Sequence, residues 1–131
     1  MLGWVLGTIG VAYVCNVVSE RNYYKREYYR IRLNFENHRR LLSGYDYINK
    51  YAKSIGYKGA VDFFYYLAEN HDERFGHFAR FLYKVRCIRN NVAHNGTQYD
   101  IDKNFINHIG VCVKICDAYK RLPRNKILYL N

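Results

Sequence analysis

The sequence predicts an all-α fold, a bundle of four to five helices with an apolar N-terminal helix. Proline occurs once in 131 residues, and half of the residues are hydrophobic. The chain therefore has few helix breakers and enough apolar side chains for a core. Apolar residues recur at spacings of three and four, as in helices that bury one face, and no segment alternates as a strand does. The length fits one domain.

Residues 1–18 form the first expected element and carry no charged side chain. As a helix they extend about 27 Å, just enough to cross the hydrocarbon core of a bilayer. The basic residues that follow would stay on the cytoplasmic side. One expectation is thus a membrane anchor that holds a cytoplasmic domain of residues 19–131 at the inner face of the membrane. The other is a buried first helix of a bundle, and the spacing of Gly3 and Gly7 permits close helix packing in either case.

Turn and capping signals divide the domain of residues 19–131. Five helices are expected, over residues 19–42, 45–55, 60–69, 73–94 and 103–122. Ser43 and Gly44 are expected to stop the first of them. Asp72 and Asp102 are expected to cap the last two at their N-termini, and Pro123 follows the final helix. Residues 124–131 are expected to add a short extended piece.

The helix expected over residues 19–42 combines an apolar stripe with a basic face. This segment contains seven Lys or Arg residues and three Glu residues. The stripe recurs at helical spacing and consists of Tyr24, Tyr28, Ile31 and Phe35. In the next helix the expected inward positions are Tyr47, Ile48, Tyr51 and Ala52.

The charge and the cysteines restrict the function classes. A formal net charge of +10 suits a nucleic acid or an anionic membrane surface as partner, although a solvated basic face has the same composition. The four cysteines show no CxxC pair and no Cys/His spacing of a zinc site, so we expect neither a metal nor another cofactor. Reduced thiols in a cytosolic core are the interpretation of Cys15, Cys87, Cys112 and Cys116.

Residues 86–96 hold the strongest candidate for chemistry. Asn90 and His94 are four residues apart, which is about one helical turn, and Arg89 is long enough to reach the same space. Arginine offers a fixed cation with a forked donor, and histidine titrates near neutrality. The three residues suit phosphate binding and proton transfer. The alternative is a buried structural cluster at the end of the helix.

The pattern Arg89-Asn90-x-x-x-His94, late in a helix and followed by Gly96, resembles the Arg-polar-x-x-x-His motif of HEPN domains. These domains are small all-α bundles, and the resemblance covers roughly residues 39–122. It implies a metal-independent endoribonuclease in which the RNA 2′-OH attacks the adjacent phosphate and leaves a 2′,3′-cyclic phosphate. Arg89 would then neutralise or orient the phosphate, Asn90 would hold the phosphate or His94, and His94 would be the general acid/base.

The resemblance also implies partners. HEPN ribonucleases work as homodimers with a composite active site, and many are toxins or antiviral defence effectors, so an inhibitory or sensor partner is expected. The residues around the motif that are expected to contact RNA are Lys84, Arg86, Asn91 and Asn95. The chain departs from the toxin subgroup that has Tyr two residues after the His, because position 96 is Gly and the tyrosine is displaced to Tyr99.

Two other functions remain open from the sequence. The first is a non-catalytic HEPN-like module that binds RNA or nucleotides or that dimerises. The second is a small membrane-associated structural protein whose basic residues 21–40 bind anionic lipid.

Overall fold

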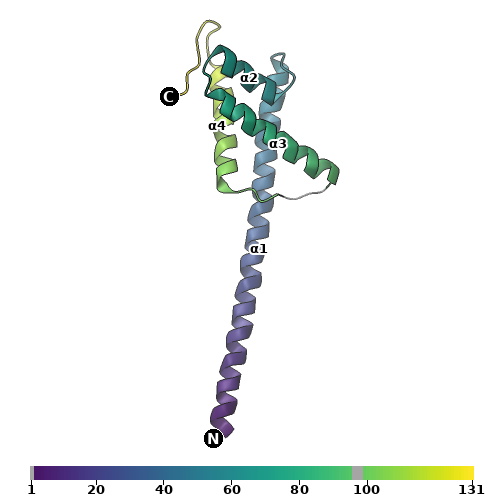
Figure 1. Ribbon diagram of the computed structural model, residues 1–131, viewed down its shortest axis with the longest axis vertical. Coiled ribbons are helices and arrows are strands. Elements are labelled where there is room, and N and C mark those ends of the chain that lie inside the picture. Colours follow the sequence, from purple (N-terminus) through teal and green to yellow (C-terminus); the bar gives the residue numbers. More distant parts are fainter. Residues whose placement is uncertain (1, 96–98) are drawn as a thin grey trace. The chain divides into compact units, whose positions relative to one another are not determined.

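The computed structural model describes the backbone of residues 2–95 and 99–131, and the side chains of residues 19–93 and 99–131. This part of the chain contains four helices and no strand, which confirms the all-α expectation. The helices are α1 (Leu2–Ser54), α2 (Ala60–Asn70), α3 (Phe75–Asn95) and α4 (Lys103–Lys120), as Figure 1 shows. The chain divides into two units, Met1–Phe35 and Glu36–Asn131, and each is described by itself.

The first helix does not break at Ser43 and Gly44, so the expectation of separate helices over residues 19–42 and 45–55 is wrong. Gly44 serves the packing of two helices and does not form a turn. A Cβ atom at Gly44 would lie 2.8 Å from Cγ1 of Ile109, which belongs to α4. Gly44 therefore lets the Ile109 side chain of α4 pack closely against the backbone of α1.

Two acidic residues begin the later helices in different ways. Asp102 is the N-cap of α4, as expected, and its carboxylate accepts a hydrogen bond from the Phe105 amide at 3.1 Å. Asp72 was expected to cap a helix that begins at residue 73, but α3 begins at Phe75. The Asp72 carboxylate accepts from the Arg74 amide at 3.0 Å, and so it closes the turn that leads into α3.

The core of the second unit draws on all four helices. Its largest fully buried side chains include Phe63, Phe64 and Phe75. From α1, Ile48 and Ala52 point inward as expected, whereas Tyr47 is exposed and Tyr45 takes the buried position. One helical turn separates Tyr45 from residue 48 or 49, so the inward face of α1 is simply rotated from the expected one.

The cysteines fall into two classes. Cys112 and Cys116, one turn apart in α4, are fully buried free thiols, as the sequence predicts. Burial raises the pKa of Cys112 well above its usual range and raises the pKa of Cys116 to about 12, so both stay protonated and unreactive. Cys87 is exposed, so the expectation of a buried thiol is wrong there, and its neighbour Ile88 is buried instead. The side chain of Cys15 lies outside the described part of the chain.

The C-terminal tail is held by the turn between α2 and α3. The Leu128 amide donates to Nδ1 of His71 at 3.1 Å, and the Leu130 amide donates to the Asp72 carboxylate at 2.9 Å. Both leucines pack against the core. The tail, which is not helical, is thus attached to the rest of the second unit by these hydrogen bonds and apolar contacts.

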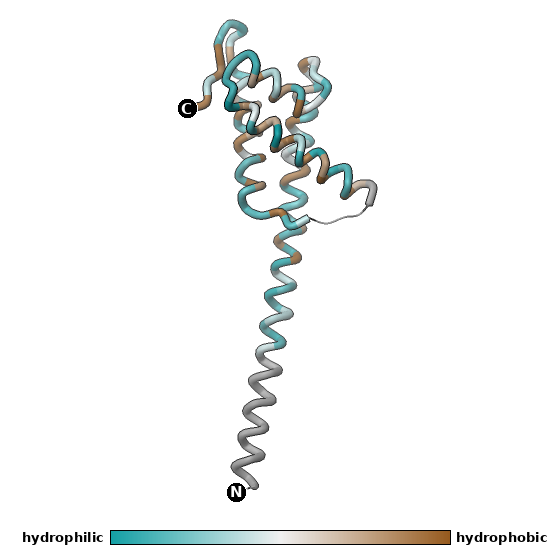
Figure 2. Tube along the Cα trace, in the orientation of Figure 1, coloured by the Kyte–Doolittle hydropathy of each residue, from teal (hydrophilic) through white to brown (hydrophobic). Residues whose placement is uncertain are grey.

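In the first unit the apolar stripe of α1 is exposed. Figure 2 shows mainly hydrophilic residues in the described part of this unit, with hydrophobic ones between them. Tyr24, Tyr28, Ile31 and Phe35 all belong to the exposed large hydrophobic residues. Folding of the single chain therefore leaves this stripe unburied.

Within residues 19–93 and 99–131, whose side chains the structure describes, no helix has both the length and the apolar content that a membrane crossing needs. The anchor expected over residues 1–18 stays a prediction.

Candidate functional site

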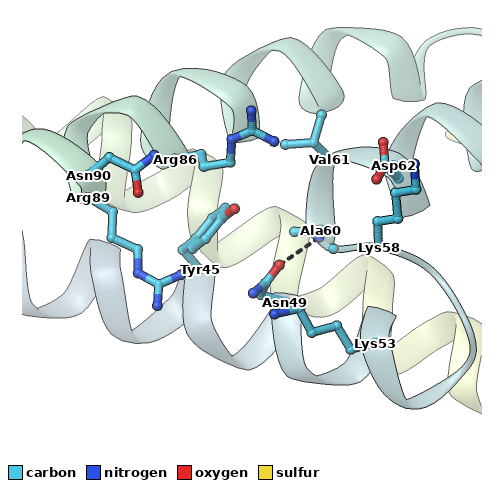
Figure 3. A pocket seen from close by; sticks show the side chains of 11 residues that line it. Tyr45, Asn49, Lys53, Lys58, Ala60, Val61, Asp62, Arg86, Arg89 and Asn90 are labelled. Atoms are coloured by element: carbon cyan, nitrogen blue, oxygen red, sulfur yellow. Dashed lines mark hydrogen bonds between the residues drawn. The ribbon is translucent and has the colours of Figure 1, made fainter.

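A pocket of about 310 Å³ in the second unit brings part of the predicted motif together with residues from two other helices (Figure 3). Arg86, Arg89 and Asn90 reach it from α3. Lys53 comes from the last turn of α1, and Lys58 lies in the loop that follows. The residues that line it are Tyr45, Asn49, Lys53, Lys58, Gly59, Ala60, Val61, Asp62, Arg86, Arg89 and Asn90. Among these residues, four cations stand against one carboxylate, so the pocket favours an anion.

Arg89 extends from α3 toward α1. Its guanidinium lies 5.7 Å from the centre of the Tyr45 ring, and its Nη1 atom lies 3.4 Å from Oδ1 of Asp46. Both partners of this ion pair are about half exposed, so the pair is worth no more than about 1 kcal/mol. An anionic ligand in the pocket can therefore compete with Asp46 for the guanidinium.

Arg86 extends from the neighbouring turn of α3 toward the start of α2, as Figure 3 shows. Its guanidinium also lies 5.2 Å from the centre of the Tyr83 ring. Stacking on an aromatic ring holds a guanidinium in place without neutralising its charge. Arg86 thus keeps its positive charge for a ligand in the pocket.

The N-terminus of α2 lines the pocket and is fastened to α1 by a hydrogen bond. The side-chain oxygen of Asn49 accepts a hydrogen bond from the Ala60 amide at 3.0 Å. A Cβ atom at Gly59 would lie only 2.6 Å from that same oxygen. A side chain at position 59 would therefore displace the Asn49 amide and disturb this hydrogen bond. The positive end of the α2 dipole lies at the pocket beside the lysines.

Tyr45 contributes a buried phenol to the pocket wall. Burial raises the pKa of Tyr45 above its usual value, although the charges of Arg86 and Arg89 act in the opposite direction. The hydroxyl consequently stays protonated at neutral pH and can donate a hydrogen bond to an anion.

The residues expected to contact RNA do not all face this pocket. Arg86 lines it, but Lys84 lies on another side of α3, with its ammonium 5.1 Å from the centre of the Phe105 ring. There Lys84 borders a second pocket of about 350 Å³ between α3 and α4, together with Arg80 and two histidines, His77 and His108. Lys84 and Arg86 point to different sides of α3, because residues two apart in a helix are about 200° apart around its axis.

Asn91 has a structural partner. Its amide nitrogen donates to the Tyr99 hydroxyl at 2.6 Å, and both side chains are half buried. The backbone after Tyr99 is held from α1, where Asn37 donates to the Ile101 carbonyl at 2.8 Å. Nε2 of His38 lies 2.5 Å from the Tyr99 carbonyl oxygen and 3.1 Å from the Tyr99 amide, so it serves one of them according to its tautomer. The displaced tyrosine thus fastens the return of the chain after the motif.

His94 and Asn95 are the last two residues of α3. His94 follows Asn90 by one helical turn along the backbone, as the motif requires. The structure describes neither the side chains of these two residues nor residues 96–98, which include the Gly96 that follows the motif.

Sequence reasoning missed the half of the pocket that comes from α1 and the start of α2. The missed residues are Tyr45, Asn49, Lys53 and Lys58. Two lysines on either side of the turn at Gly56 gave a weak local signal of a basic site. Asn49 gave none, because its role depends on a contact with Ala60 across the turn.

Among the described side chains, no three His, Cys, Asp or Glu residues lie close enough together to hold a metal ion. Comparison of the chain with models of protein families, with curated proteins and with solved structures finds no match.

Proposed function

We propose that this protein is a metal-independent endoribonuclease of the HEPN type, with Arg89, Asn90 and His94 at its active site. The observation that carries the proposal is the basic pocket in which Arg86, Arg89 and Asn90 meet Lys53 and Lys58. An RNA phosphate carries the complementary charge. Two guanidiniums and the end of the α2 dipole supply donors for its oxygens.

The proposed reaction needs charge stabilisation and proton transfer. The 2′-oxygen of the RNA forms a bond to phosphorus as the bond from phosphorus to the 5′-oxygen breaks, which leaves a 2′,3′-cyclic phosphate. A base takes the 2′-OH proton, and an acid gives a proton to the leaving 5′-oxygen. His94 is the proposed proton-transfer group. Arg89 balances the charge that builds up on the phosphate, with Asn90 as a neutral donor beside it.

The reaction needs one group as the base and another as the acid, and a single His94 can fill only one of these roles at a time. A homodimer in which two motifs share a cleft would supply both. We therefore include a composite site in the proposal, along with an inhibitory or sensor partner that controls a toxin or antiviral effector of this kind.

The test is cleavage of single-stranded RNA by the purified full chain in EDTA. His94→Ala should abolish cleavage, and Arg89→Ala should reduce it by about 100-fold or more, the usual effect of losing one stabilising donor. His77→Ala and Arg80→Ala are the matched controls, because they change the same residue types on α3 at the other pocket. Equal activity of His94→Ala and the unmodified protein would refute the proposal.

A second candidate is an RNA-binding or nucleotide-binding module without catalysis. It is favoured by the charge of the lining, because the described residues of the pocket include four cations. Binding requires only that charge, and its affinity should fall steeply with salt. RNA binding that depends on Arg86 and Arg89, with no product at any pH from 5 to 9, would support this candidate over the enzyme.

A further inference from the structure

We propose that residues 20–35 of α1 form a parallel coiled coil with the same segment of a second copy of this chain. The proposal concerns the first unit only and does not rest on the proposed ribonuclease activity. It starts from the stripe of Tyr24, Tyr28, Ile31 and Phe35, whose side chains are between 56% and 67% exposed. Spacings of four, three and four residues are those of the a and d positions of a heptad.

The heptad assigns the flanking residues without further choice. With Tyr28 and Phe35 at a, the residues Tyr24 and Ile31 fall at d. The e positions are then Lys25 and Arg32, and the g positions are Glu20, Glu27 and the uncharged Asn34. The stripe is thus bordered by cations on one side and by carboxylates on the other.

This arrangement of charge specifies the partner. In a parallel coiled coil, a g residue lies beside the e residue of the next heptad in the other chain. Glu20 would face Lys25 of the second copy, and Glu27 would face Arg32 of the second copy, and symmetry forms each pair twice. An antiparallel dimer would place e beside e and g beside g, so that cations meet cations and carboxylates meet carboxylates. The same sequence therefore favours a parallel pair of identical chains.

The carboxylate of Glu27 is already held on the helix surface. Nε of Arg30 lies 2.6 Å from its Oε2 atom. A carboxylate accepts hydrogen bonds at both oxygens, so this contact orients Glu27 and is compatible with a second cation. Arg30 falls at c, outside the proposed seam.

The heptad pattern of the seam continues in the sequence before residue 20. In the sequence, the same three-and-four spacing continues toward the N-terminus through Arg21, Val17 and Val14. Arg21 is the charged exception, at an a position next to Glu20, and a single polar a residue is a known means of fixing register and strand number. The helix itself runs from Leu2 without a break.

A pair of matched substitutions tests the seam in the full chain. Ile31 at d and Leu33 at f are similarly exposed, at 56% and 60%. We expect the unmodified protein to sediment as a dimer, Ile31→Asp to sediment as a monomer, and Leu33→Asp to remain a dimer. Circular dichroism checks that both variants keep their helix. A monomeric unmodified protein, or a dimer that Ile31→Asp leaves intact, overturns the proposal, even if the protein binds lipid vesicles or another protein through this stripe.

Charge reversal tests the flanks. One variant carries Glu20→Lys and Glu27→Lys, and the other carries Lys25→Glu and Arg32→Glu. Each variant alone places like charges across the seam and should be a monomer. An equal mixture restores every pair and should give a dimer that contains one chain of each kind. A mixture that stays monomeric overturns the assignment of e and g positions.

Orientation is tested by disulfide formation in a background with Cys15→Ser and Cys87→Ser. In a parallel pair the two copies of position 28 face each other, so Tyr28→Cys should cross-link to itself under mild oxidation. Tyr29→Cys, at b, should not. A dimer in which Tyr28→Cys fails to cross-link would contradict the parallel register. Failure of the charge-reversal or cross-linking test concerns this seam alone and leaves the proposed ribonuclease activity untouched, whereas a monomeric unmodified protein would also remove its composite site.

Discussion

The contact between Gly44 and Ile109 allows a prediction whose sign can be worked out from the structure. Replacing glycine by alanine within a helix stabilises it by about 1 kcal/mol, because alanine has the higher helix propensity. At Gly44 the new Cβ atom would lie 2.8 Å from Cγ1 of Ile109, a side chain that is nearly fully buried. Overpacking of a buried contact costs about 1 to 3 kcal/mol. The net effect of Gly44→Ala on the free energy of unfolding should therefore lie between no gain and a loss of about 2 kcal/mol.

Gly110 supplies the matched control, since it also lies within a helix and a Cβ atom there would meet nothing within 4 Å. Gly110→Ala should raise the free energy of unfolding by about 1 kcal/mol. Urea unfolding of the full chain measures both changes, and unchanged slopes show that the unfolded state is comparable. In an Ile109→Ala background the clash is gone, and Gly44→Ala should then stabilise. Equal stabilisation by Gly44→Ala and Gly110→Ala in the unmodified background would refute the packing argument.

Three further predictions concern the pocket and the tail. Gly59→Ala should weaken the Asn49 cap of α2, lower the free energy of unfolding by about 1 kcal/mol and reduce RNA binding, as measured by urea unfolding and fluorescence anisotropy. Arg86→Ala should make the decrease of log affinity for single-stranded RNA with log salt less steep by about 0.7, whereas Lys84→Ala should leave this slope unchanged if RNA binds only the pocket lined by Arg86 and Arg89. Hydrogen bonds from the amides of residues 74 and 130 lower the pKa of Asp72, so its carboxylate stabilises the folded chain above about pH 3.9 and loses that effect as the pH falls through the lowered pKa. Asp72→Asn should therefore have a lower free energy of unfolding than the unmodified protein at pH 7, and urea unfolding at pH 3 should show a smaller difference. An equal difference at both pH values would contradict a role for the Asp72 charge.

The sequence was informative where the determinant is local. Asp102 could be predicted as an N-cap because the amide it binds is three residues away, and Arg86, Arg89 and Asn90 could be grouped because one helix carries all three. Gly44 could not be interpreted, because its purpose depends on Ile109 in another helix. Local signals alone made it a helix stop, which is the commoner use of a Ser-Gly pair.

The candidate site shows the same division. The motif on α3 was found from its spacing, but the lysines and the Asn49 cap that complete the pocket come from residues that only the fold brings near. Asn91 illustrates the converse. From the sequence it was one more polar residue beside the motif, and in the fold its amide binds the Tyr99 hydroxyl. A polar side chain near a motif can thus serve either the ligand or the frame, and only its partner distinguishes the two.

The composition of the pocket separates the two proposed functions through their dependence on pH. Arginine and lysine keep their charge across the physiological range. Burial also keeps the Tyr45 hydroxyl protonated. Phosphate binding by these residues should accordingly change little between pH 5 and 8. Proton transfer requires a group that titrates in that interval, and in the motif that group is His94. If cleavage varies with pH while affinity does not, the imidazole acts in the reaction, whereas RNA binding without any cleavage product across this range would assign the pocket to binding alone.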